Sequence, residues 1–188
     1  MAPWIVSARS GPRARRPAIG AALALMLSAG TAMAAADAPF PADPADRAQV
    51  ETWIVQNLDV TGYSATGWSP NALFFASIGQ ISLDAYPVVR TAVWTEVISP
   101  AAARQAGWRS ALVQVDFDCK AKRYRELSRT VYALADRKGA GLPGSAVKAW
   151  QTPDPDTTMA TTQDEVCYRA KSTMDLYAAR PPVPGGPR

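Results

Sequence analysis

The most constraining feature of this sequence is a regular alternation of apolar and polar residues that leads to its first cysteine. Within residues 108–119, the odd positions from Ala111 to Cys119 are apolar, whereas Ser110, Gln114, Asp116 and Asp118 are polar. A period of two is typical of a half-buried antiparallel strand. We therefore expect the side chain of Cys119 on the core side of a sheet.

A second alternation predicts another strand at residues 88–98. Its odd positions from Val89 to Val97 are β-branched, and Ala92 and Trp94 lie on the other face. Residues 123–135 contain Tyr124 and further apolar residues, but their alternation is broken, and a hairpin with the preceding strand is the simplest interpretation. The glycines and proline of residues 136–145 predict a loop, and a short strand is expected at residues 146–150.

The hydrophobic period changes near the C-terminus. Six residues recur at spacings of three and four, namely Met159, Thr162, Val166, Ala170, Met174 and Tyr177. This spacing predicts a helix with Asp156 or Thr157 as its N-cap. Residues 46–58 fit either a helix face or a buried strand, and both readings stay open.

The N-terminal residues 1–34 are predicted to be a secretory signal peptide. Four arginines precede an apolar run at residues 18–30, and a small-residue cleavage pattern ends at Ala34. The run is shorter than the roughly 20 residues of a membrane-spanning helix. Export by the Sec route is expected, to the periplasm or beyond the cell, without a permanent membrane span. No cysteine near Ala34 could receive a lipid anchor.

The net positive charge of the whole sequence comes from its first 34 residues. The whole sequence has 20 Lys and Arg and 16 Asp and Glu. Residues 1–34 contain four of the arginines and no acid, which leaves 16 cations against 16 anions. The basic bulk charge therefore belongs to the signal peptide, and nucleic acid is not an expected partner.

The remaining chain is expected to form one domain. Residues 35–47 are rich in proline and alanine and predict a linker or a loosely docked arm, and residues 48–179 contain the periodic segments. Residues 180–188 combine proline and glycine in a composition that cannot form a core, which predicts a disordered tail.

Two cysteines in an exported chain predict one disulfide, between Cys119 and Cys167. Cys167 lies at the edge of the apolar stripe of the predicted C-terminal helix, so a helix packed on a sheet could bring it to Cys119. Closing a loop of about 49 residues stabilises the fold by about 4 kcal/mol in the chain-entropy description.

The chain contains no histidine, which excludes Ser-His-Asp and Cys-His catalysis and most zinc or copper sites. Ser145 and Lys148 match an S-x-x-K pattern without the other elements of penicillin-recognising enzymes. Asp116 and Asp118 are explained by charge pairing across the hairpin, opposite its arginines. We predict no enzyme activity, no cofactor and no metal.

A basic cluster follows Cys119 and is the candidate ligand-contact site. Its members are Lys120, Lys122, Arg123, Tyr124 and Arg125. Cations beside an aromatic ring suit a sulfated glycan, a phosphate group or an acidic protein surface. The alternative is a solvated hairpin tip whose charges discourage strand-edge aggregation.

Several motifs resemble the surface-adhesin E-like domain family of exported bacterial proteins. They are Phe74–Phe75 with Ser77–Ile78, the pair Val93–Trp94, residues 115–132, Trp150, and the final residues 165–167. The similarity covers about residues 50–168. It implies an antiparallel sheet joined by a disulfide to a C-terminal helix, and a non-enzymatic role in adhesion to host matrix and serum proteins.

The predicted fold class is α+β, with an antiparallel sheet of about five or six strands and a C-terminal helix packed on it and tied by the disulfide. The expected function is binding of a protein or an anionic glycan. The alternative is a periplasmic accessory protein that contacts envelope components and has no host-binding role.

Overall fold

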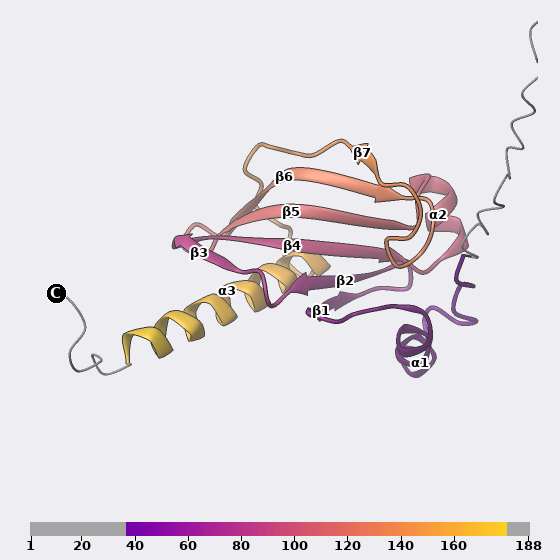
Figure 1. Cartoon of the computed structure of the whole chain (residues 1–188), viewed down its shortest axis with the longest axis horizontal. Helices are drawn as coiled ribbons and strands as arrows, with labels where there is room; N and C mark the ends of the chain where they lie inside the picture. Colours follow the sequence, from indigo (N-terminus) through magenta and orange to yellow (C-terminus); the bar gives the residue numbers. More distant parts are fainter. Residues whose placement is uncertain (1–36, 180–188) are drawn as a thin grey trace, which may run out of the picture. The chain divides into compact units, whose positions relative to one another are not determined.

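The computed structural model describes residues 37–179, so the predicted signal peptide and C-terminal tail lie outside the described residues. The described chain has three helices and seven strands (Figure 1). In chain order they are α1 (Arg47–Asn57), β1 (Tyr63–Trp68), β2 (Ala72–Ser77), β3 (Ser82–Ala85), β4 (Val88–Val97), α2 (Pro100–Ala106), β5 (Ser110–Asp118), β6 (Arg123–Tyr132), β7 (Leu142–Gly144) and α3 (Thr158–Ala178).

All seven strands join one antiparallel sheet, in the order β1-β2-β4-β5-β6-β7, with β3 paired to β4. Short turns join β1 to β2, β3 to β4 and β5 to β6, whereas the connection from β4 to β5 contains α2. Strand β2 lies beside β4 because β3 is off the path. The α+β prediction is confirmed, with one or two strands more than expected.

The predicted hairpin of β5 and β6 is present, and the broken alternation in β6 has a local cause. The register pairs Val115 with Glu126 but Gln114 with Ser128, so Leu127 is an extra residue in β6. Such a β-bulge shifts the side-chain period by one. Tyr124 and Glu126, before the bulge, and Arg129, after it, consequently share the face of the sheet on which α3 packs.

The open question at residues 46–58 is resolved as the helix α1. Asp46 caps it by accepting hydrogen bonds from the backbone nitrogens of Ala48 (2.9 Å) and Gln49 (3.3 Å). This capping satisfies N–H groups that have no partner inside the helix. Val50 and Trp53 are the buried residues of α1.

The segment before α1 contacts the folded core. Trp53 Nε1 donates a hydrogen bond to the carbonyl of Pro39 (2.6 Å). Asp37 accepts from the backbone nitrogen of Ala135 (2.8 Å) and forms an ion pair with Arg109. The guanidinium of Arg109 also lies 3.7 Å above the ring of Phe40. The first described residues are therefore held against β5 and the chain that follows β6.

Two expectations for short elements were wrong. The structure has a strand, β7, within the segment predicted as a loop, and residues 146–150, predicted as a short strand, are not a strand. Helix α2 was not predicted, although Ser99 caps it, Pro100 begins it and Gly107 ends it at a φ of 75°. These signals are informative, but seven residues are too few to show a helical period.

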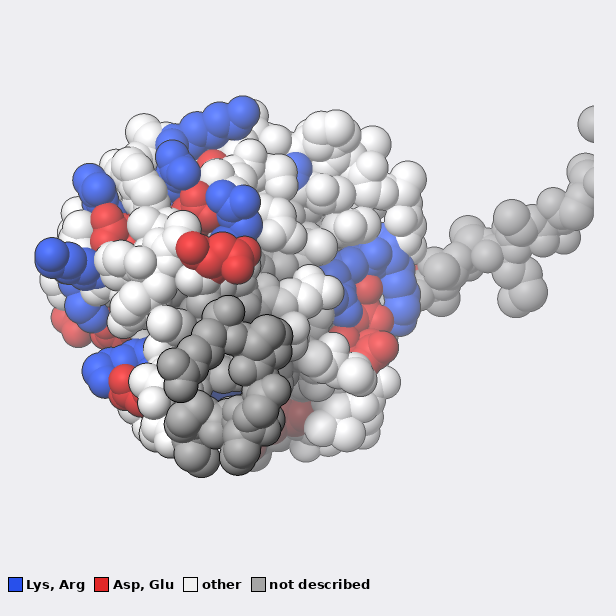
Figure 2. Space-filling model, turned by 60° about the vertical axis from the view of Figure 1, so that its left-hand side comes forward, with Lys and Arg blue, Asp and Glu red and all other residues white. Residues whose placement is uncertain are grey.

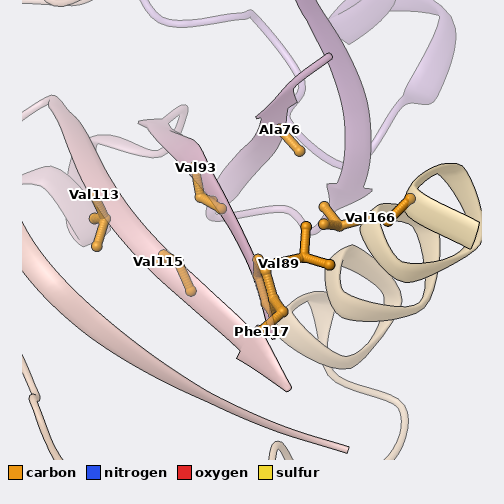
Figure 3. Packing of buried hydrophobic residues seen from close by; sticks show 8 residues of the cluster. Ala76, Val89, Val93, Val113, Val115, Phe117 and Val166 are labelled. Carbon is orange, nitrogen blue, oxygen red and sulfur yellow. The ribbon is translucent and has the colours of Figure 1, made fainter. Parts of the chain in front are cut away.

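The residues of β5 are largely buried on both faces of the sheet, which differs from the half-buried strand predicted there. One face carries Val89, Val115 and Phe117, which pack against Val166 and Ala170 of α3 (Figure 3). The opposite face carries a second cluster that includes Trp94 and residues of α1. The rings of Trp94 and Phe75 are stacked there with centroids 4.6 Å apart.

The predicted disulfide is confirmed. Cys119 and Cys167 are bonded, with Cα atoms 5.5 Å apart, and the bond joins the end of β5 to α3. The N-cap of α3 is Thr157, whose hydroxyl accepts from the backbone nitrogen of Ala160 (3.3 Å).

The predicted apolar stripe of α3 is buried in its first half only. Val166 and Ala170 are buried, whereas Met174 and Tyr177 are exposed. The C-terminal turns of α3 extend past the strands that its first turns cover (Figure 1). The exposure of the second half follows from this length, because no strand lies beneath it.

Candidate functional site

The turn between β5 and β6 is fixed from three directions. Cys119 is bonded to α3, and Asp118 Oδ1 accepts a hydrogen bond from the backbone nitrogen of Ala121 (2.9 Å). Gln163 of α3 is 2% exposed and donates to the carbonyl of Arg123 (3.2 Å). The start of β6, which contains most of the predicted basic cluster, is therefore held to both the sheet and the helix.

At this end of the sheet, one buried carboxylate holds two partly exposed arginine side chains in place. Asp116 is 1% exposed, and its oxygens accept hydrogen bonds from Arg90 Nε (2.8 Å) and Arg125 Nη2 (2.9 Å). Arg90 lies on β4, Asp116 on β5 and Arg125 on β6, so the three side chains form a row across neighbouring strands. Both guanidiniums are oriented by the same acceptor.

A second pair lies beside this row. Arg123 Nε donates to Asp118 Oδ2 (3.1 Å), as the register of the hairpin places them opposite one another. The ring of Trp150 then stacks on both arginines of β6, with its centroid 4.9 Å from the guanidinium carbon of Arg123 and 4.6 Å from that of Arg125. We call Arg90, Arg123, Arg125 and Trp150 the arginine face.

The structure separates the other members of the predicted cluster from the arginine face. Tyr124 lies on the opposite face of the sheet, where it packs against Phe117 and its hydroxyl donates to Gln151 Oε1 (3.0 Å). Lys122 forms an ion pair with Asp164 of α3 (2.6 Å), and Lys120 is exposed in the turn. Arg90 was missed, because only the register of β4 and β5 shows that it lies opposite Asp116.

The arginines determine the charge of the two acids. Burial alone would raise the pKa of Asp116, but the hydrogen bonds and charges of Arg90 and Arg125 outweigh it and hold the pKa below its ordinary value. The backbone N–H of Ala121, with the help of Arg123, lowers the pKa of Asp118. Both acids are therefore ionised near neutral pH.

The cations of the arginine face are each paired with an acid, Arg90 and Arg125 with Asp116 and Arg123 with Asp118. Figure 2 shows one face of the molecule, on which groups of Lys and Arg lie beside Asp and Glu. Long-range attraction of an anion is weak for such a surface, since neighbouring opposite charges cancel at a distance. Recognition would depend on the fixed geometry of the arginines at short range.

A second buried carboxylate lies on the same face of the sheet as the arginine face, in the cluster of Trp94. Glu96 is fully buried, and its Oε2 accepts from Trp94 Nε1 (3.1 Å) and from the backbone nitrogen of Asp136 (3.1 Å). Burial raises the pKa of Glu96 to about 7, although these bonds, Ser110 and the charge of Arg109 oppose the rise.

No metal site is apparent between residues 37 and 179. In that range no three His, Cys, Asp or Glu side chains are grouped so that they could hold a metal ion. Ser145 and Lys148 are exposed and lie outside the helices. The helices of the described residues include none that is long and apolar enough to span a membrane.

Comparisons with known proteins identify a matching family and several similar solved structures. The model of the family described as surface-adhesin protein E matches residues 71–168. A comparison with curated proteins found no match.

The chain is also similar to structures of Haemophilus influenzae protein E. One is 14% identical, covering 71% of this chain and 96% of that chain, with a TM-score of 0.48. Crystal form II is 16% identical, covering 59% and 91%, with a TM-score of 0.47. The selenomethionine form is 16% identical, covering 71% and 98%, with a TM-score of 0.49.

Proposed function

The chain belongs to the surface-adhesin protein E family, and on this premise we propose that it is an exported protein that acts by binding a partner and not by catalysis. The partner we propose is a protein or glycan that presents anionic groups. The observation that carries this proposal is the arginine face, in which Asp116 and Asp118 fix three guanidiniums at one end of the sheet.

The donors left over on these arginines support the choice of partner. Arg123 uses only Nε on Asp118, and Arg90 and Arg125 each use Nε and Nη2 on Asp116. The remaining guanidinium nitrogens can donate to sulfate or carboxylate oxygens, which guanidinium groups bind well. Arg90, Arg123 and Arg125 are 55%, 44% and 36% exposed, so a ligand can reach them. Trp150 adds a flat surface for a sugar ring.

Binding to immobilised dextran sulfate, with unsulfated dextran as the reference, tests the proposal. Glutamine is the replacement of choice, because its amide can still donate to Asp116 and Asp118. The test variant replaces the three arginines of the arginine face: Arg90→Gln, Arg123→Gln and Arg125→Gln. The matched control removes the same number of charges at exposed positions elsewhere: Arg47→Gln, Arg104→Gln and Lys171→Gln.

We expect the test variant to lose binding and the control to keep it, and we expect added salt to weaken binding of the native protein. Equal losses in both variants would assign binding to net charge, and unchanged binding in the test variant would remove the arginine face from the site. Circular dichroism of both variants checks that they are folded.

The alternative function is that of a periplasmic accessory protein that contacts envelope components. It rests on the same export prediction and differs in location and in having no host-binding role. Labelling intact cells with a membrane-impermeant biotin reagent separates the two possibilities. Modified lysines are expected for a protein on the exterior, and labelling only after the envelope is opened indicates the periplasm.

A further inference from the structure

Helix α3 covers only part of the face on which it packs, and the uncovered part contains a pocket. Figure 3 shows α3 beside Ala76, Val89 and Phe117, whereas Val113 lies further along the sheet, away from the helix. The uncovered residues line a pocket of about 220 Å³. It lies on the sheet face opposite the arginine face, since side chains alternate along β4 and β5.

The floor and walls of the pocket are apolar. Val93, Val113 and Val115 form the floor and are at most 5% exposed. The indole of Trp108, before β5, and the thioether of Met159, in the first turn of α3, belong to the walls. Rings and thioethers both make favourable contacts with an aromatic ring.

The polar part of the pocket is electrically balanced. Glu126 is 5% exposed and forms an ion pair with Arg129, which also lines the pocket. The backbone nitrogen of Val147 donates to Glu126 Oε2 (3.2 Å), and the backbone nitrogen of Glu126 donates to the carbonyl of Val147 (2.9 Å). The chain after β7 thus holds the pair in place, and an added charge of either sign would meet one like charge.

From this geometry we infer that the pocket is a binding site for one uncharged aromatic ring. A cavity of roughly 150 Å³ holds a benzene molecule, so 220 Å³ admits a ring with a small substituent. A hydroxyl on the ring can donate to Glu126 Oε1, which accepts one hydrogen bond, from Arg129. The ring belongs either to a free small molecule or to a side chain of a partner protein.

This inference is independent of the proposed function, because it uses none of the residues of the arginine face. A loss of dextran sulfate binding and a loss of ring binding would be separate results. The two sites could be occupied together, since the sheet separates them.

Ligand binding to the wild-type protein is the first test, and phenol is the probe. Methyl resonances of Val93, Val113 and Val115 should shift on titration, with a Kd on the order of 0.1 to 1 mM for a ligand of this size. Benzoate and cyclohexanol should bind more weakly, since one carries a charge and the other lacks an aromatic ring. Tighter binding of either compound, or shifts at Val50 instead of these three valines, would overturn the inference.

N-acetyltyrosinamide distinguishes the two sources of the ring. If it binds as phenol does, the mouth of the pocket admits a ring attached to a backbone, and a partner side chain is the occupant. If phenol alone binds, the occupant is a free small molecule. Binding of neither compound would sink the inference.

Two variants connect binding to the pocket. Thr95→Phe places a ring in it and should weaken phenol binding at least tenfold, whereas Ser128→Phe adds the same ring at an exposed position of β6 on the other face. Met159→Ala removes the thioether wall and leaves the pocket larger, and it should weaken binding about two- to tenfold. Phenol binding that survives both Thr95→Phe and Met159→Ala would contradict the assignment.

Discussion

The buried carboxylate of Glu96 makes stability depend on pH in an unusual direction. Its pKa is raised from an ordinary value of 4.5 to about 7 in the folded state. Below about pH 4.5 the group is protonated in both folded and unfolded chains. Between about pH 4.5 and 7 the unfolded chain releases this proton and the folded chain retains it, so rising pH favours unfolding.

The size of the effect follows from the difference between the two pKa values. At 1.36 kcal/mol for each pH unit, it corresponds to a loss of about 3 kcal/mol between about pH 4.5 and 7. Full burial of Glu96 justifies the conversion, because solvent does not screen the group. Such a loss is a large part of the roughly 5 to 15 kcal/mol by which domains are stable.

The matched variant is Glu96→Gln, which has the same shape and does not titrate. Urea unfolding followed by tryptophan fluorescence, from about pH 4.5 to 7.5, gives the free energy of unfolding of both proteins. The wild type should lose about 3 kcal/mol relative to the variant over this range. The depressed pKa values of Asp116 and Asp118 act below about pH 4 and occur in both proteins, so they cancel. Parallel profiles would refute the reasoning.

Three further predictions concern the attachment of α3 to the sheet, each measured as a free energy of unfolding in urea. Replacing both Cys119 and Cys167 with serine should cost about 4 kcal/mol, and reduction of the wild type should give a similar loss. Gly67→Val should cost about 1 to 3 kcal/mol, because a Cβ at Gly67 would lie 3.0 Å from Thr158 Cβ. The control is Gly79→Val, where an added Cβ has nothing within 4 Å, and its free energy of unfolding should stay within about 0.5 kcal/mol of the wild type. Thr157→Ala should cost about 1 kcal/mol and Thr157→Ser much less, and equal losses would exclude the capping hydroxyl as the cause.

Segments with a strong period were predictable from the sequence, because one face of each is continuously buried. The strands β4 and β5 and the helix α3 are of this kind, and the N-cap of α3 was among the residues expected. Strand β7 could not be predicted in the same way. It has three residues, Leu142–Gly144, which contain both a proline and a glycine, and its pairing with β6 is a tertiary effect.

In the candidate site, only the contacts between residues close in the sequence could be predicted. A hairpin implies that arginines after the turn face acids before it, and Arg123 and Arg125 do face Asp118 and Asp116. Arg90 is 26 residues from Asp116, and its place depends on the register between β4 and β5. Tyr124 follows from the same hairpin register, which places it opposite Phe117 and on the other face from Arg123 and Arg125, whereas the face of the β6 residues after the β-bulge could not be predicted.

The bond between Cys119 and Cys167 has a consequence for cleavage of the chain by a protease. It spans a sequence separation of 48 residues, within which residues 138–143 are exposed. A single cut in this segment, for example after Lys138, would leave β7 and α3 covalently tethered to the fragment that contains β5 and β6. The arginine face would stay attached to its helix after such a cut, and separation of the fragments would require a reductant as well as a protease.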